Sequence, residues 1–233
     1  MTVHPKPQTD AVVVAAGRSR RMRDVDKLWA LLTGPDGRPR PLLAHTLAAF
    51  QACPCVRRVA LVIGDAEERA KALIRDEGLD KVHAVVPGGA RRQDSVRAGL
   101  EALSGCQWVV VQDGARPLVS AELIERGLEA AQATGASVCA VPVPDTVKEG
   151  DETGHVVSTP DRSHLWLAQT PQVFRYDLLV QAHACAAGDA TDDAALVEAM
   201  GVKVRLYLGS PGNLKVTTPE DLAMAQALLQ GSP

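Results

Sequence analysis

Five short runs of apolar, mostly β-branched residues recur along the first two thirds of the chain. Each is about as long as a strand and does not alternate with polar residues, a pattern typical of strands buried on both faces of a sheet. The runs are Ala11–Ala15, Val59–Ile63, Val82–Val86, Trp108–Val111 and Ser137–Val141.

Helix-length segments with apolar residues three and four positions apart separate these runs. They are Leu42–Ala52, Ala66–Glu77, Ser95–Leu103 and Ala121–Ala133. Strands that alternate with helices imply parallel pairing through right-handed crossovers. We therefore predict an α/β fold with an open, three-layer, mostly parallel Rossmann-like sheet.

Residues 143–160 interrupt the alternation, because prolines, glycines and charges replace the apolar pattern. Such a composition predicts an extended arm or hairpin outside the sheet. Core-like character returns at Leu165–Phe174. Beyond it we predict helices at Tyr176–Ala187 and Asp192–Met200, a strand at Val202–Leu208, and a final helix at Pro219–Leu229 capped by Thr218.

Composition narrows the functional classes. The 233 residues are 46% hydrophobic, which excludes overall disorder and allows one sizeable domain. The formal charge is −3, and three Trp, two Tyr and two Phe are the only aromatics, so a nucleic-acid binder is disfavoured.

No apolar run approaches the ~20 residues that span a bilayer, so we expect no membrane segment. The polar N-terminal segment does not resemble a signal peptide, and we expect a cytoplasmic protein.

In open α/β sheets, ligands bind beyond the carboxyl ends of the strands, so the residues there are the first candidates. Ala15-Ala16-Gly17 follows the first predicted strand and leads into the arginine-rich residues 18–23. Small residues let backbone N–H groups approach a phosphate, and the arginines neutralise it. The alternatives are a solvated basic turn and a nucleic-acid patch, which would bind in a salt-sensitive way.

Two further loops end at the same predicted edge. Gly88 and Gly89 precede Arg91 and Arg92, which suggests a second anion site, although an ordinary turn capped by Asp94 or Ser95 has the same pattern. Asp113 ends the fourth strand, where a carboxylate can hold Mg²⁺ together with phosphate oxygens. A helix cap or an Asp–Arg ion pair is the alternative for Asp113. Together the loops suggest phosphoryl transfer from a nucleotide.

Other chemistries lack their motifs. The histidines do not have metal-ligand spacing, and no GxSxG segment marks a hydrolase. Later in the chain, Thr170-Pro171-Gln172 follows an apolar stretch, and Lys215 lies in a turn-rich segment before the last helix. By itself, Lys215 would be taken for a surface lysine.

The order of these motifs is shared with one enzyme family. Asp145-Thr146-Val147-Lys148, Thr170-Pro171-Gln172 and Asn213-Leu214-Lys215-Val216-Thr217 are the most specific segments, whereas Ala15-Ala16-Gly17 occurs in many sugar-phosphate nucleotidyltransferases. From about Asp10 to Leu229, the chain resembles the 2-C-methyl-D-erythritol 4-phosphate cytidylyltransferase family of the non-mevalonate isoprenoid pathway. The resemblance implies a nucleotidyltransferase domain over residues 1–233 that transfers CMP from CTP to methylerythritol phosphate and releases pyrophosphate.

The resemblance also implies roles for single residues. The catalytic residues are Arg21, Lys27, Arg162 and Lys215, of which the first two stabilise the transition state and the last two hold the attacking phosphate. The CTP contacts are Ala15, Ala16, Gly17, Gly89, Arg92, Ser95 and Gly114. The sugar-phosphate contacts are Asp113, Thr146, Arg162, Thr170, Thr191 and Lys215, and Asp113 is also the Mg²⁺ ligand.

The resemblance further implies a homodimer. The arm, here about residues 143–171, reaches the partner, so that Thr146 and Arg162 act in the neighbouring site. The chain departs from the family pattern at several positions: Ser19 replaces a glycine, Asp26 a proline, Ala90 an acidic residue and Asp193 a glutamate. A related enzyme that activates ribitol 5-phosphate or another polyol phosphate with CTP is the closest alternative.

Overall fold

A seven-stranded sheet forms the centre of the computed structural model, which describes residues 8–17 and 26–231. Its strand order is β11-β7-β10-β6-β1-β4-β5, and only β10 runs antiparallel to its neighbours. The strands are β1 (Thr9–Ala15), β4 (Val56–Ile63), β5 (Val82–Pro87), β6 (Trp108–Asp113), β7 (Ala136–Pro142), β10 (Trp166–Arg175) and β11 (Arg205–Leu208). The predicted α/β class with a mostly parallel sheet is confirmed.

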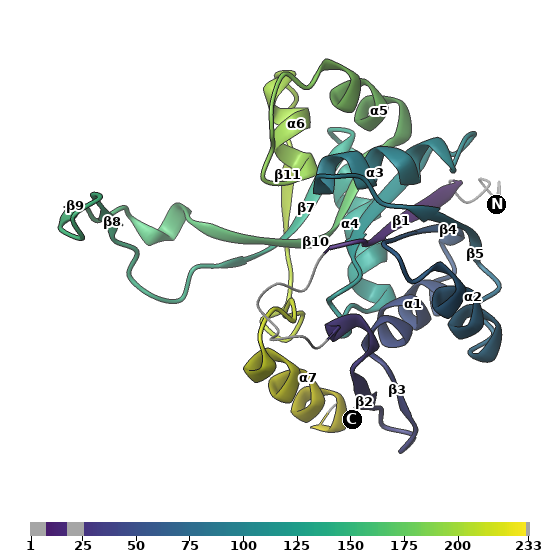
Figure 1. Ribbon diagram of the computed structural model, residues 1–233. Helices are drawn as coiled ribbons and strands as arrows, with labels where there is room; N and C mark the ends of the chain where they lie inside the picture. The colour runs from purple at the N-terminus through teal and green to yellow at the C-terminus, as the bar shows by residue number, and fades with distance from the viewer. Residues whose placement is uncertain (1–7, 18–25, 232–233) are drawn as a thin grey trace, which may run out of the picture.

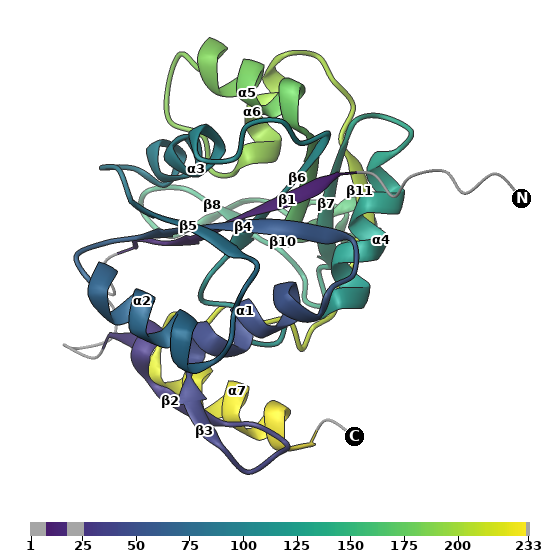
Figure 2. The ribbon, with the colours of Figure 1, turned by 90° about the vertical axis from the view of Figure 1, so that its right-hand side faces the viewer.

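Helices cover both faces of this sheet (Figure 2). One face carries α3 (Arg92–Glu101), α5 (Tyr176–Cys185) and α6 (Asp193–Ala199), and the other carries α1 (Leu42–Ala52), α2 (Glu67–Asp76) and α4 (Ala121–Ala131). Side chains of β1 alternate between the apolar cores on the two faces. Val12 packs in the core beneath α3, α5 and α6, Val13 packs in the core beneath α1, α2 and α4, and both are fully buried. The three predicted layers are therefore present.

The segment between β7 and β10 leaves the body of the protein as a long arm (Figure 1). It carries the short strands β8 (Glu149–Gly150) and β9 (Val156–Ser158) and the 3₁₀ turn η2 (Arg162–His164). The chain returns as β10, whose first residues are exposed and whose last residues lie in the core between β6 and β7. Of the arm expected at 143–171, residues 169–171 are buried in the body, because β10 already belongs to the sheet there.

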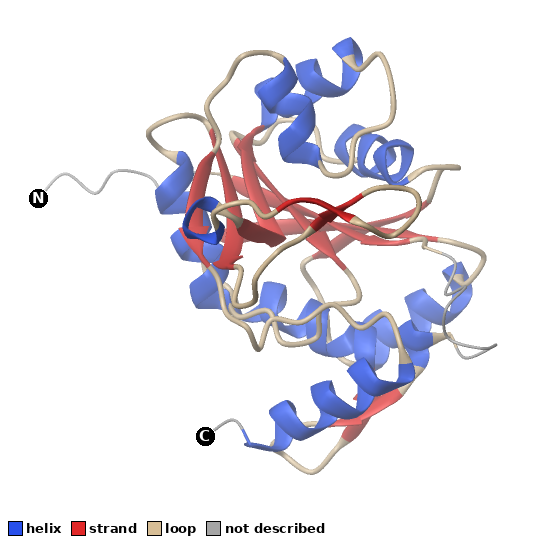
Figure 3. Ribbon diagram, turned by 90° about the vertical axis from the view of Figure 1, so that its left-hand side faces the viewer, coloured by secondary structure: helices blue, strands red, loops and turns tan. Residues whose placement is uncertain are grey.

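Some elements differ from the sequence expectation. A hairpin of β2 (Leu31–Thr33) and β3 (Pro39–Pro41) was not predicted, and α7 (Pro219–Gly231) packs beside it, on the side of the sheet opposite α5 and α6 (Figure 3). The side chain of Gln226 bonds both the N–H and the C=O of Thr33, at 2.8 and 3.0 Å. The last strand, predicted at Val202–Leu208, is shorter in the structure, where β11 begins at Arg205. The expected Thr218 cap is present, since Thr218 Oγ1 accepts a bond from the N–H of Asp221.

The start of α3 is also different, with a consequence for the site. The sequence suggested a start near Ser95, but the helix begins at Arg92, because Arg91 and Asp94 cap it reciprocally. Gly99 lets α3 approach β1 closely, since a Cβ at this position would lie 2.4 Å from Val12 Cγ1. Arg92 therefore lies on the first turn of a helix that is fixed against the central strand.

Candidate active site

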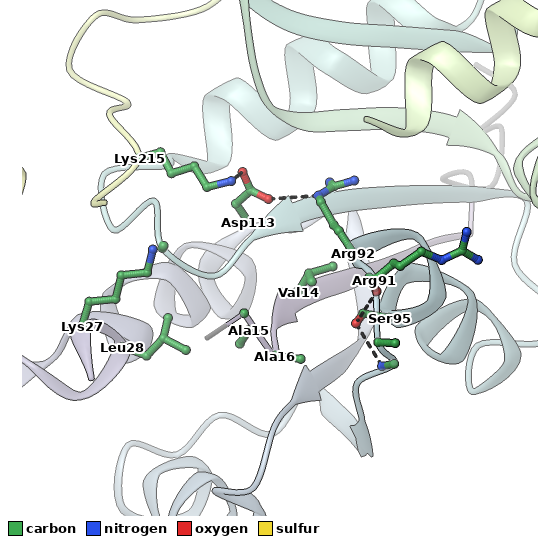
Figure 4. A pocket seen from close by; sticks show the side chains of 14 residues that line it. Val14, Ala15, Ala16, Lys27, Leu28, Arg91, Arg92, Ser95, Asp113 and Lys215 are labelled. Atoms are coloured by element: carbon green, nitrogen blue, oxygen red, sulfur yellow. Dashed lines mark hydrogen bonds and ion pairs between the residues drawn. The ribbon is translucent and has the colours of Figure 1, made fainter. Parts of the chain in front are cut away.

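A cavity of about 670 Å³ opens at the carboxyl ends of β1, β5 and β6 (Figure 4). This is the edge at which a parallel sheet binds ligands. Small residues and charged side chains make up most of its lining. The small residues include Ala15, Ala16, Gly17, Gly89 and Ala90, and the charged ones are Lys27, Arg91, Arg92, Asp113 and Lys215.

Two glycines allow the loop between β5 and α3 to pass close to its neighbours. A Cβ at Gly88 would lie 2.1 Å from Ala16 Cβ, and one at Gly89 would lie 2.3 Å from Asp94 Cβ. Ser95 holds the loop from inside, because its Oγ accepts a bond from the Gly89 N–H at 3.1 Å and donates to the Arg91 carbonyl at 3.2 Å. Only glycine fits these positions without displacing the loop.

Asp113 is the only carboxylate among the described residues that line the cavity. Its Oδ2 lies 2.9 Å from Lys215 Nζ and 3.6 Å from Arg116 Nε, and its Oδ1 lies 3.5 Å from Arg92 Nε. Burial alone would raise the pKa of Asp113, but the positive charges of Lys215, Arg92 and Arg116 outweigh it and lower that pKa to about 2. Asp113 is therefore ionised at neutral pH.

Lys27 reaches the cavity from the 3₁₀ turn η1 (Lys27–Trp29). The carboxylate of Asp26 caps this turn by accepting a bond from the Leu28 N–H at 3.2 Å. Leu28 and Trp29 are buried, and Arg69 stacks on the Trp29 ring at 4.3 Å. The Lys27 ammonium donates to the Val216 carbonyl at 2.8 Å, so Lys27 is aligned beside the segment that carries Lys215.

Two of the motifs recognised in the sequence form a scaffold behind Asp113. Thr170 Oγ1 accepts a bond from the Asp113 N–H at 3.0 Å, and Asn213 Nδ2 donates to the Thr170 carbonyl at 2.8 Å. Arg116 Nη1 in turn donates to the Asn213 carbonyl at 2.6 Å. These buried bonds fix Asp113 and the turn before Lys215 relative to each other.

The structure brings together most of the residues assigned to the nucleotide side. Those lining the cavity are Ala15, Ala16, Gly17, Lys27, Gly89, Arg92, Ser95, Asp113 and Lys215. Gly114 lies beside them, and its N–H bonds the Val14 carbonyl at 2.8 Å. Arg21 lies outside the described residues.

The residues expected on the sugar-phosphate side are more dispersed. Thr146 and Arg162 are exposed on the arm, where Arg162 Nη1 donates to the Pro144 carbonyl at 2.5 Å. Thr191 is exposed before α6, and Thr170 is buried with its hydroxyl toward the backbone of Asp113. None of these four lines the cavity of the described chain.

Sequence reasoning missed two charged residues. Arg116, three positions after Asp113, was given no role, and Asp193 was noted only as an aspartate in place of the family's glutamate. Asp193 is 1% exposed and forms a 2.6 Å ion pair with Arg92 Nη1. No local pattern could reveal this contact, because α3 and α6 meet only in the folded chain.

The donors near the cavity suit a cation that also binds phosphate. Across residues 8–17 and 26–231, no three His, Cys, Asp or Glu side chains cluster as metal ligands would. A magnesium ion commonly takes one or two carboxylates and completes its shell with water and substrate phosphates. The ionised Asp113 fits that requirement.

Known proteins match nearly the whole chain. The model of the IspD family, 2-C-methyl-D-erythritol 4-phosphate cytidylyltransferase, matches residues 9–231. The chain belongs to this family. A cytidylyltransferase of that name from Dehalococcoides mccartyi strain CBDB1 is 48% identical over 221 residues, which are 94% of this chain and 95% of the relative.

Solved IspD-type structures have the same fold. The 4-diphosphocytidyl-2C-methyl-D-erythritol synthase of Anaerococcus prevotii aligns with a TM-score of 0.82 at 29% identity, over 97% of both chains. The 2-C-methyl-D-erythritol 4-phosphate cytidylyltransferase of Thermus thermophilus aligns with a TM-score of 0.78 at 36% identity, over 96% of this chain and 99% of the other. The resemblance stated from the motifs is confirmed.

None of the helices in the described parts of the chain has the length and apolar composition needed to cross a bilayer.

Proposed function

We propose that this chain transfers CMP from CTP to 2-C-methyl-D-erythritol 4-phosphate, forming 4-diphosphocytidyl-2-C-methyl-D-erythritol and pyrophosphate. The observation that carries the proposal is the cavity at the carboxyl ends of β1, β5 and β6, where cations surround an ionised Asp113. Membership of the IspD family supports the same reaction.

In this reaction, a phosphate oxygen of the sugar phosphate attacks the α-phosphorus of CTP. A new P–O bond forms, the bond between the α-phosphorus and the bridging oxygen breaks, and pyrophosphate leaves with the electron pair. Catalysis requires positioned positive charge, because negative charge accumulates on the phosphoryl oxygens. Lys27, Arg92 and Lys215 provide it from three separate segments of the described chain. Arg21 has the same role in the proposal.

Backbone N–H groups and small residues hold the nucleotide in this proposal. The loop that follows β1 and the Gly88–Gly89 turn lie side by side, and a Cβ at Gly88 would meet Ala16. Since Ala90 has no polar group, cytosine is recognised there by the backbone. Asp113 would hold Mg²⁺, which neutralises phosphate charge when it is bound.

The sugar phosphate is bound by Thr146, Arg162, Thr170, Thr191 and Lys215 in this proposal, with the first two supplied by the arm of a second copy. The chain then acts as one nucleotidyltransferase domain with a dimerisation arm at 143–171. Exposed apolar side chains support a partner, because Val156 and Val157 at the arm tip are 61% and 63% exposed. The proposal also assigns the reaction to the cytoplasm.

The test is pyrophosphate release by the purified protein with CTP and Mg²⁺ across a panel of polyol phosphates. We expect the highest kcat/KM with methylerythritol phosphate, and much lower values with ribitol 5-phosphate and erythritol 4-phosphate. ATP, GTP and UTP in place of CTP measure base selectivity. A preference for ribitol 5-phosphate would assign the chain to the alternative reaction, and no release with any acceptor would refute the proposal.

A further inference from the structure

Asp193 is a buried carboxylate that lies outside the cavity but contacts a residue lining it. It is the first residue of α6, and it is 1% exposed. Its Oδ2 lies 2.6 Å from Arg92 Nη1, and its Oδ1 lies 3.0 Å from His183 Nε2. A carboxylate is costly to bury unless it is paired, so both bonds are needed to keep Asp193 inside the protein.

His183 is the second partner of the Asp193 carboxylate. Its Nε2 faces Asp193, whereas its Nδ1 is buried and has no partner among the described residues. The charge of Asp193 is balanced by Arg92, because a guanidinium is always protonated in proteins.

The guanidinium of Arg92 lies between two carboxylates that attract it in different directions. Nη1 is 2.6 Å from Asp193, whereas Nε is 3.5 Å from Asp113, which is too long for a strong charge-assisted hydrogen bond. Asp193 therefore takes the stronger contact and leaves Asp113 only loosely paired with Arg92. Without that contact, the planar guanidinium could turn and close both of its donors onto Asp113.

We propose that Asp193 is a positioning residue for the nucleotide site: by holding Arg92, it keeps Asp113 accessible to the Mg²⁺ complex of CTP. The inference rests on the proposed function, since it takes the cavity to be the CTP site. Asp193 acts only through Arg92, because it does not line the cavity itself. Loss of its charge should therefore weaken binding of the magnesium nucleotide and leave the sugar-phosphate side unchanged.

The neighbouring arginine offers a matched control. Arg91 Nη1 also lies 2.6 Å from an aspartate, Asp189, but the Asp189 side chain is 76% exposed. Exposed ion pairs contribute little, because water screens them and the side chains are free to move. Asp189→Asn is therefore the same chemical change, four positions before Asp193, at a site where we expect no functional effect.

The experiment compares Asp193→Asn, Asp193→Glu and Asp189→Asn with the unmodified protein. Calorimetry with CTP and Mg²⁺, without acceptor, measures nucleotide affinity, and steady-state kinetics measures KM for each substrate. We expect Asp193→Asn to weaken CTP affinity and raise the KM for CTP about 10- to 100-fold, as loss of a supporting partner typically does. The KM for the acceptor should remain close to the unmodified value. Asp193→Glu restores the charge and should recover most of the affinity.

A double-mutant cycle tests whether Asp193 acts through Arg92. In an Arg92→Gln background, Asp193→Asn should change CTP affinity no further. The double variant also keeps the test possible if Asp193→Asn alone fails to fold, because it removes both charges of the buried pair. Unchanged CTP affinity in Asp193→Asn, an equal rise in both KM values, or full additivity in the cycle would overturn the inference. Absence of CTP binding and turnover in the unmodified protein would instead refute the proposed function.

Discussion

Lys215 Nζ lies 2.9 Å from Asp113 Oδ2, and this ion pair joins the end of β6 to the segment before α7. The Lys215 side chain is 40% exposed and the Asp113 side chain only 10%, so the ammonium stands between the buried carboxylate and the opening of the cavity. In the proposed reaction, this ammonium holds the attacking phosphate of the acceptor. Lys215 can therefore pair with Asp113 in the empty site and with phosphate in the occupied one.

Lys215→Met should lower kcat/KM about 100- to 1,000-fold, because a preorganised cation is lost where negative charge accumulates. Steady-state pyrophosphate release measures the effect. Lys203→Met, which changes an exposed lysine before β11, serves as the control and should behave like the unmodified protein. A kcat/KM that falls equally in both variants would contradict a specific role for Lys215.

Lys27→Ala should reduce kcat by a similar factor of about 100 or more, since its ammonium is held beside the Val216 carbonyl at the cavity. Lys71→Ala on the surface of α2 is the matched control, because the Lys71 ammonium forms exposed ion pairs with Glu67 and Glu68 of the same helix. The same assay with Arg21→Ala tests the role assigned to Arg21 from the sequence. Near-normal kcat in Lys27→Ala would remove Lys27 from the catalytic residues.

Asp113 should make stability depend on pH in the acid range. Since the pKa of Asp113 is about 2 in the folded protein and 3.8 ordinarily, its ionised form stabilises the fold above about pH 4, and this contribution disappears as the pH falls toward 2. The difference corresponds to about 2 kcal/mol in the free energy of unfolding. About half of this difference, roughly 1 kcal/mol, is lost between pH 7 and pH 3. Urea unfolding at these two pH values measures that loss, with Asp113→Asn as the reference. If both proteins lose stability in parallel between these values, Asp113 does not titrate in this way.

Gly88→Ala should distort the turn between β5 and α3, because its Cβ would lie 2.1 Å from Ala16 Cβ. Overpacking of this kind typically costs about 1–3 kcal/mol, and the displaced loop should also raise the KM for CTP. Gly188→Ala is the control, since a Cβ there has no neighbour within 4 Å and its backbone is not in the left-handed region. Thermal unfolding and CTP kinetics report the two effects. A Gly88→Ala protein as stable and active as Gly188→Ala would contradict the close packing.

Mixing two inactive variants tests the shared site of the proposed dimer. If Arg162 acts in the neighbouring subunit and Lys27 in its own, a mixed dimer of Arg162→Ala and Lys27→Ala has one intact site. Random exchange should then recover about a quarter of the unmodified activity, because half of the dimers are mixed. Each variant mixed with itself is the control. No recovery, despite subunit exchange shown by differently tagged chains, would place Arg162 in its own subunit's site.

The sequence predicted the parallel part of the fold well, because strands such as β1 and β6 are buried on both faces and have continuous apolar runs. It did not predict the antiparallel insertion of β10. Residues 166–168 are exposed and residues 169–174 are buried, so the burial of this strand changes along its length. The hairpin of β2 and β3 is short and contains three prolines, and Gln226 of α7 holds it with two hydrogen bonds to the backbone of Thr33.

The parts of the site that directly follow a strand could be predicted from the sequence. Asp113 and the Gly88–Gly89 turn follow strands whose carboxyl ends share an edge, so their meeting could be inferred from topology. The contact between Arg92 and Asp193 could not, because it depends on the packing of α6 against the first turn of α3. Likewise, the scaffold role of Thr170 depends on the unexpected direction of β10.

β10 also limits how the arm can change in evolution or by engineering. The strand that brings the chain back from the arm is the one that joins β6 to β7, and its Thr170 bonds the backbone of Asp113. A deletion that extended from the arm through β10 would separate β6 from β7 and remove a support of the site. Length can therefore vary only toward the tip, near Gly154, and any grafted tag or insertion belongs there.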